Sequence, residues 1–124
     1  MADDPRRALG ALGEQLASDH LTRLGFRIVE RNFRTRWGEL DIIAATPGAL
    51  IFCEVKTRIA RAPGRDPLES VHPRKRLKVR RMAAQWLSER PDHPRAAELR
   101  FDAVGVTLTS AGRLLALEHL EGAF

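Results

Sequence analysis

Two acidic residues and a lysine have a spacing that suits a metal-dependent hydrolytic site. Glu54 and Lys56 lie two positions apart in an apolar segment, and Asp41 lies thirteen residues before Glu54 in another. Side chains alternate between the two faces of a strand, so Glu54 and Lys56 are expected on one face. Because neighbouring strands lie about 4.8 Å apart, Asp41 and Glu54 could bind one ion at the roughly 2.0–2.1 Å distances that Mg²⁺ requires. Carboxylate oxygens suit Mg²⁺ or Mn²⁺ better than Zn²⁺.

Each of these residues also has a purely structural interpretation. Glu54 and Lys56 could form an exposed ion pair worth less than about 1 kcal/mol, and Asp41 could belong to a turn. The combination of two acids and a lysine on one predicted hairpin, beside a basic segment, favours the metal site. Glu39 shares the expected face of Asp41 and is a further candidate ligand.

The basic residues are concentrated in one part of the chain. There are 21 lysines and arginines against 16 acidic residues, a net charge of +5. The window from Lys56 to Arg81 holds ten basic and two acidic residues, a net charge of +8. Such a field attracts phosphate polymers, although a solvated helix face would have the same composition. Lys56 is one of three lysines among mostly arginines, which indicates a need for lysine chemistry at this position.

The pattern of apolar residues predicts the elements that must position these side chains. Helices are expected at 8–24 and 73–89, and strands at 26–33, 40–45, 50–57, 99–108 and 114–120. The alternation of the first strand is disturbed near Asn32. Two prolines and a glycine predict a mobile loop at 59–71. The order α-β-β-β-α-β-β predicts a single α/β domain over 1–124, with a mixed sheet and an ordered core from about 8 to about 120.

Composition excludes several classes of protein. With one cysteine, the chain cannot form an intramolecular disulfide framework. The longest apolar run is five residues, far below the ~20 that span a bilayer. The acidic start of the chain is unlike a secretory signal. We therefore expect a cytoplasmic protein that does not associate with membranes.

Two segments of the sequence resemble a known nuclease superfamily. GELDII at 38–43 and FCEVKTR at 52–58 are similar to the PD-(D/E)xK nucleases. More narrowly, they resemble the bacterial YraN-type endonuclease-like family, which is related to archaeal Holliday-junction resolvases. An early helix with Glu14 and a late Arg100-Phe101-Asp102 strand extend the resemblance over nearly the whole chain. Leu40 stands where the superfamily name has a proline.

This resemblance implies a fold, a site and an activity. The fold is restriction-endonuclease-like, with three α/β/α layers around a mixed five-stranded sheet. Asp41, Glu54 and the Val55 backbone carbonyl would be metal ligands, Lys56 the catalytic lysine and Glu14 an accessory acid. The implied activity is Mg²⁺- or Mn²⁺-dependent hydrolysis of DNA phosphodiesters, with branched or single-stranded DNA as the expected substrate. A homodimer is also implied.

The remaining expectations concern how the site works and what it binds. Lys56 is expected to orient water and stabilise charge, because nearby carboxylates favour its charged form. Asp102 is expected to support the fold or to position the metal ligands, and not to be a ligand itself. A nucleic-acid-binding module without turnover and an interaction domain for an acidic protein remain alternatives, although an intact Asp41, Glu54 and Lys56 set favours catalysis. The DNA backbone is expected to bind Arg58, Arg74, Lys75, Lys78 and Arg81.

Overall fold

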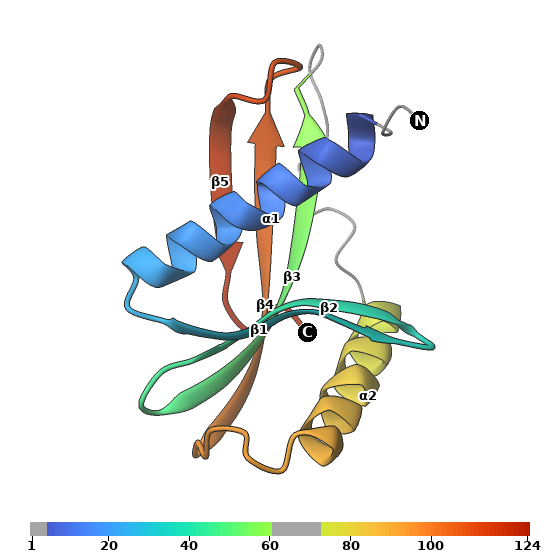
Figure 1. Ribbon diagram of the computed structural model, residues 1–124, viewed down its shortest axis with the longest axis vertical. Helices are drawn as coiled ribbons and strands as arrows, with labels where there is room; N and C mark the ends of the chain where they lie inside the picture. The colour runs from blue at the N-terminus through green and yellow to red at the C-terminus, as the bar shows by residue number, and fades with distance from the viewer. Residues whose placement is uncertain (1–4, 61–72) are drawn as a thin grey trace.

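The computed structural model describes residues 5–60 and 73–124, except for the side chains of residues 5 and 73–75. Within these residues the order α-β-β-β-α-β-β is confirmed (Figure 1). The elements are α1 (Pro5–Arg23), β1 (Arg27–Thr35), β2 (Gly38–Ala45), β3 (Ala49–Ile59), α2 (Pro73–Glu89), β4 (Glu98–Leu108) and β5 (Leu114–Leu120). Ile59, expected at the start of a loop, instead ends β3 because its pairing with β4 continues that far. The rest of that predicted loop, from residue 61 onward, lies outside the described residues.

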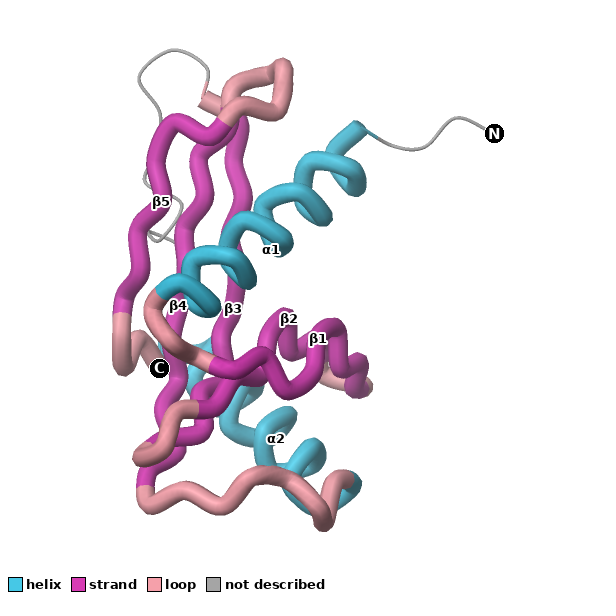
Figure 2. The backbone as a smooth tube through the Cα atoms, turned by 60° about the vertical axis from the view of Figure 1, so that its left-hand side comes forward, coloured by secondary structure: helices cyan, strands magenta, loops and turns pink. Residues whose placement is uncertain are grey.

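The described strands form a mixed sheet in the order β1-β2-β3-β4-β5. Strands β1, β2 and β3 are antiparallel neighbours, β3 and β4 are parallel, and β5 is antiparallel to β4. A parallel pair needs a crossover connection, and α2 lies in it. Figure 2 shows the β1–β2 hairpin leaving the plane of the other strands and running between the two helices.

The two helices cover opposite faces of the sheet, which confirms the three-layer α/β/α architecture. On the α2 face, the ring of Phe52 packs against Trp86 and Phe101, with centroids 5.8 and 5.4 Å away. On the α1 face, Leu21 packs into a second core with Ile51 and other residues of β2, β3 and β4. Neither described helix has the length and apolar character needed to cross a membrane.

Strand β1 changes faces at Asn32. In a regular strand, residues two positions apart share a face, yet Arg31 contacts Glu14 of α1 while Phe33 lies in the α2-face core. Between them, Asn32 has a φ of 58°. Asparagine tolerates this left-handed conformation better than most residues. The disturbed alternation near Asn32 is therefore a real change of direction in the strand.

Strand β2 makes the same change at Asp41, which lies beside Asn32 in the β1–β2 register. Leu40 lies in the α2-face core and Ile42 in the α1-face core, although they are two positions apart. Strict alternation, which would place Asp41 and Ile43 on one face, is therefore wrong for this strand. Asp41 therefore lies where the alternation of side chains along β2 is broken, at a position predicted to bind a metal ion.

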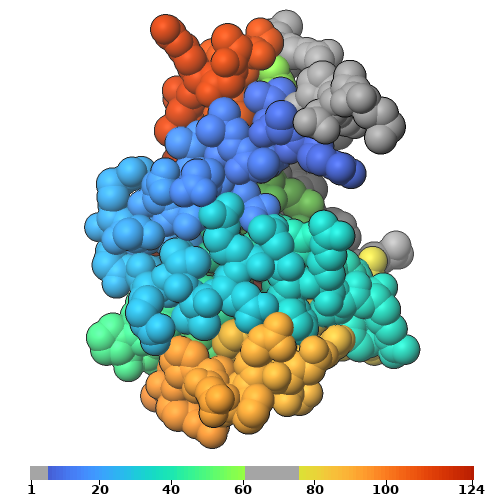
Figure 3. Space-filling model, viewed as in Figure 1, coloured from blue at the N-terminus to red at the C-terminus, as the bar shows by residue number. Residues whose placement is uncertain are grey.

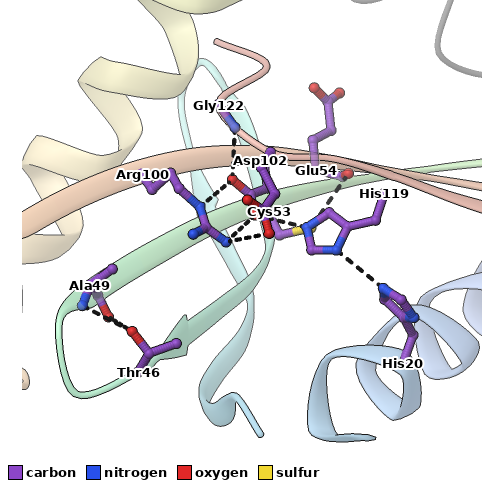
Figure 4. A network of polar contacts seen from close by, with 10 residues as sticks. His20, Thr46, Ala49, Cys53, Glu54, Arg100, Asp102, His119 and Gly122 are labelled. Atoms are coloured by element: carbon purple, nitrogen blue, oxygen red, sulfur yellow. Dashed lines mark hydrogen bonds and ion pairs between the residues drawn. The ribbon is translucent and has the colours of Figure 1, made fainter. Parts of the chain in front are cut away.

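A buried polar network joins β4, β5 and α1 on the α1 face (Figure 4). The carboxylate of Asp102 is fully buried and accepts hydrogen bonds from Arg100, His119 and the backbone N–H of Gly122. Burial alone would raise its pKa, but these donors outweigh burial and lower it. His119 also contacts His20 at 3.1 Å. The network fastens the end of α1 to the sheet, in agreement with a structural role for Asp102.

Candidate metal centre and nucleic-acid interface

The candidate site lies where β2 and β3 separate. Their pairing ends at Ile42 and Cys53, whereas the pairing of β3 with β4 continues to Ile59. Asp41 and Glu54 are the next residues beyond the last β2–β3 pair, and we call this point the β2/β3 fork. The backbone N–H of Val55 donates a hydrogen bond of 2.7 Å to Asp41 Oδ2 in place of a ladder partner.

Three carboxylates from two elements meet at the fork. Glu14 of α1 and Glu39 and Asp41 of β2 each offer an oxygen, and these oxygens lie within 4.8 Å of one another. We call these three residues the carboxylate cluster. It is built partly by Gly13, because a Cβ at this position would collide with the side chain of Thr57. The missing side chain lets α1 lie directly on β3 and brings Glu14 to the fork.

The cluster is electrostatically strained without a cation. Burial raises the pKa of Asp41 to about 7, and the neighbouring Glu14, Glu54 and Glu39 add to the rise despite the Val55 hydrogen bond. Burial also raises the pKa of Glu14, although the Arg31 guanidinium opposes this shift. A divalent cation would relieve both the desolvation and the repulsion.

Glu54 and Lys56 form an ion pair on β3, with Lys56 Nζ 3.0 Å from Glu54 Oε1. Their predicted position side by side is therefore seen directly. Glu54 also lines a pocket of about 170 Å³ on the α2 side, together with Glu39 and Lys78. Glu54 is not a member of the carboxylate cluster, whereas Glu14 and Glu39 are.

The chemistry of these side chains fits a hard divalent cation. Glu14, Glu39 and Asp41 could supply carboxylate oxygens, which Mg²⁺ and Mn²⁺ prefer as ligands. Glu54 and the Val55 carbonyl lie on the neighbouring strand at the fork and could complete the set. The three grouped acids are therefore Asp41, Glu14 and Glu39. From the sequence, Glu14 is expected only as an accessory acid and Glu39 only as a further candidate ligand.

The residues predicted to bind DNA lie in different parts of the structure. Lys78 and Arg81 are exposed on α2, and Lys78 lines the pocket beside Glu54. Arg58 is near the end of β3 and lines a separate pocket with the first turns of α1. The side chains of Arg74 and Lys75, although these residues begin α2, lie outside the described residues.

Sequence reasoning missed three arginines beside the cluster. Arg31 Nη2 lies 3.5 Å from Glu14 Oε1, and Arg34 Nε lies 3.5 Å from Glu39 Oε2. Arg7 lines the same pocket as Arg31, Arg34 and Glu14. They lie outside the basic window 56–81, in a part of the chain that has no net positive charge. The sequence feature that could have identified them is the pair Arg31 and Arg34, which flank Asn32, where the alternation of the strand is disturbed.

Comparison with known proteins shows the family. The pattern of the uncharacterised protein family UPF0102 matches residues 13–106. The UPF0102 protein of Frankia alni is 44% identical over 124 residues, covering 100% of both chains. That of Mycolicibacterium vanbaalenii is 43% identical over 96% of this chain and 95% of its own length, and that of Pelobacter propionicus is 42% identical over 95% and 83%. The chain therefore belongs to family UPF0102, the YraN family.

Proposed function

We propose that the protein is a divalent-metal-dependent endonuclease that hydrolyses DNA phosphodiesters. The observation that carries this proposal is the meeting of carboxylates from α1 and β2 at the β2/β3 fork, beside the Glu54–Lys56 pair of β3. The resemblance of this arrangement's sequence motifs to PD-(D/E)xK nucleases supports the same activity. Branched or single-stranded DNA is the proposed substrate.

The carboxylates and Lys56 have distinct parts in this reaction. When bound, Mg²⁺ or Mn²⁺ polarises a phosphate oxygen and makes hydroxide available near neutral pH. Glu14, Glu39 and Asp41 would hold the ion, and the Val55 N–H keeps the Asp41 carboxylate in place. Glu54 would lie beside them as a ligand on the other strand.

Lys56 would stabilise the charge that develops on the phosphate. Its ammonium lies 3.0 Å from the Glu54 carboxylate, which favours the charged form and holds the side chain at the site. A charged ammonium donates hydrogen bonds and cannot accept a proton. We therefore assign Lys56 to orienting water and to charge stabilisation rather than to general-base catalysis.

Cleavage of labelled DNA tests the proposed function. Duplex, single-stranded, flap and four-way-junction DNA would be incubated with wild type or Lys56→Ala, in Mn²⁺ or in EDTA. We expect cleavage that requires both Mn²⁺ and Lys56, with the Lys56→Ala protein still folded by circular dichroism. A salt-sensitive gel shift without cleavage would instead identify a nucleic-acid-binding module. Full turnover by Lys56→Ala would contradict the role given to this lysine.

We further propose that two copies pair through β5. The two edges of the sheet are β1 and β5, and natural edge strands are usually protected by charge or irregularity. β1 is protected in this way by its bulge, its left-handed Asn32 and its arginines. β5 has no lysine, arginine or proline, its one acidic residue is the exposed Glu118, and it exposes Leu114, Leu115 and Leu120 by 44, 57 and 44%.

The charges flanking β5 suit this pairing. An antiparallel pair of β5 strands centred on Leu117 would place Arg113 of one copy opposite Glu121 of the other. Because the dimer would have two-fold symmetry, this contact between Arg113 and Glu121 would occur twice. Between the two ion pairs, Leu114 of one copy would lie beside Leu120 of the other, and the two Leu117 side chains would be neighbours.

A further inference from the structure

The pocket between α1 and β1 has the chemistry of a phosphate site. It has a volume of about 550 Å³ and is lined by arginines at positions 7, 31 and 34, by Asn32 and by Glu14. Arg31 and Arg34 are three positions apart and share the pocket because β1 turns at Asn32 between them, where φ is 58°. Figure 3 shows the surface on which α1 (blue) lies beside the β1–β2 hairpin (cyan). Guanidinium groups bind phosphate oxygens through paired N–H donors.

The pocket borders the carboxylate cluster directly. Glu14 belongs to both, and Arg34 contacts Glu39 of the cluster at 3.5 Å. Three arginines and three carboxylates cancel in charge when all are ionised. A divalent cation at the cluster would therefore leave this region with a net positive charge, which favours a bound phosphate.

The pocket and the basic face of α2 lie on opposite sides of the fork. Lys78 projects beside Glu54 from α2, whereas Arg7 belongs to α1 on the other face of the sheet. The hairpin that carries the fork runs between the two helices (Figure 2). A nucleic-acid strand crossing the fork could thus be held by cations on both sides of the reacting phosphate.

We propose that Arg7, Arg31 and Arg34 form a subsite for the phosphodiester backbone of DNA, next to the carboxylate cluster. This inference rests on the proposed function, since it adds a backbone contact to the same site. Arg31 is half-buried and also donates a hydrogen bond of 2.9 Å to Gln15, so it shapes the pocket as well. Arg7 and Arg34 are exposed and are the arginines best suited to substitution.

Fluorescence anisotropy with a labelled single-stranded oligonucleotide tests the subsite in the Lys56→Ala background with Mn²⁺, where the cation is present and cleavage is not expected. The variant is Arg7→Ala/Arg34→Ala, and the control is Arg23→Ala/Arg95→Ala, which removes the same charge from exposed positions outside the pocket. Each phosphate contact to a single strand contributes about 0.7 to the salt slope. We expect the variant to lose about tenfold in affinity and about 1.4 in slope, and the control to lose less than about twofold.

The outcomes separate this inference from the proposed function. Equal losses in variant and control would overturn the subsite and leave the nuclease proposal intact. A wild-type protein that neither binds nor cleaves DNA would overturn both. The single variants Arg7→Ala and Arg34→Ala, each compared with Arg95→Ala, decide the question if the double variant is unstable by circular dichroism.

Discussion

Of the carboxylates at the fork, that of Asp41 has the least favourable electrostatic environment. Its side chain accepts the Val55 N–H; burial is the main cause that raises its pKa to about 7, and three neighbouring carboxylates add to the rise. A structural carboxylate gains nothing from such neighbours, whereas a ligand for a divalent cation gains affinity. The same feature that suits the residue to a metal ion should therefore destabilise the metal-free protein.

The stability of the metal-free protein should depend on pH through Asp41. Its pKa is about 7 in the folded protein and near 3.8 without the fold, so the folded state binds more protons between these values. Stability should fall as the pH rises from about 4 to 7, by about 1–3 kcal/mol. Asp41→Asn keeps an oxygen for the Val55 N–H and should lose most of this dependence. Urea unfolding in EDTA at pH 5 and pH 8 measures it.

A matched control separates Asp41 from other acids. Asp92→Asn changes an exposed carboxylate after α2 and should keep the wild-type difference between pH 5 and pH 8. If Asp41→Asn showed the same difference as wild type, the proton held at the fork would belong to another group. The assignment of strain to Asp41 would then be wrong.

Residue spacing could predict the meeting of the two strands but not the full carboxylate cluster. Asp41 and Glu54 follow the last β2–β3 pair, as expected of a short hairpin. Glu39 and Glu14 reach Asp41 because the hairpin changes faces and because α1 lies close to β3. Both causes involve backbone conformation and helix placement, which alternation of side chains does not encode.

Among the helices and strands, α1 is the element whose placement matters most for the site. Gly13 lies against Thr57, whereas Gly10, three residues earlier on the same helix, has nothing within 4 Å of a Cβ position. Two glycines of one helix thus serve different purposes. Only Gly13 is required for the contact that carries Glu14 to the fork.

Gly13→Ala and Gly10→Ala should have opposite effects on stability. Alanine at position 13 must push α1 away from β3 and should cost about 1–3 kcal/mol. Alanine at position 10 should stabilise the helix by about 0.5–1 kcal/mol. Urea unfolding of the two variants checks this. Equal stabilisation by both would contradict the close contact between α1 and β3.

The elements themselves could largely be predicted from the sequence. The helix at Pro73–Glu89 and the strand at Leu114–Leu120 have the expected bounds. The direction in which β1 changes faces at Asn32 could not be predicted, because a disturbed alternation of side chains does not reveal a φ of 58°. The sequence also left open which face of the sheet each helix covers.

The two edges of the sheet formed by the described strands differ in a way that predicts self-association. Leu115 is 57% exposed on β5, and lysine at an edge strand opposes pairing. Leu115→Lys should therefore convert a dimer into a monomer, measured by size-exclusion chromatography with light scattering. Leu24→Lys, a control at a 52% exposed leucine after α1, should leave the dimer unchanged. A wild-type monomer at high concentration would contradict pairing through β5.

The proposed activity requires that the carboxylates at the β2/β3 fork hold a divalent cation. Isothermal titration of Mn²⁺ into wild type, Asp41→Asn and Asp92→Asn measures this directly. We predict saturable binding to wild type and Asp92→Asn, with affinity at least about tenfold lower for Asp41→Asn. Equal Mn²⁺ binding by all three proteins, or no binding to wild type, would contradict the claim.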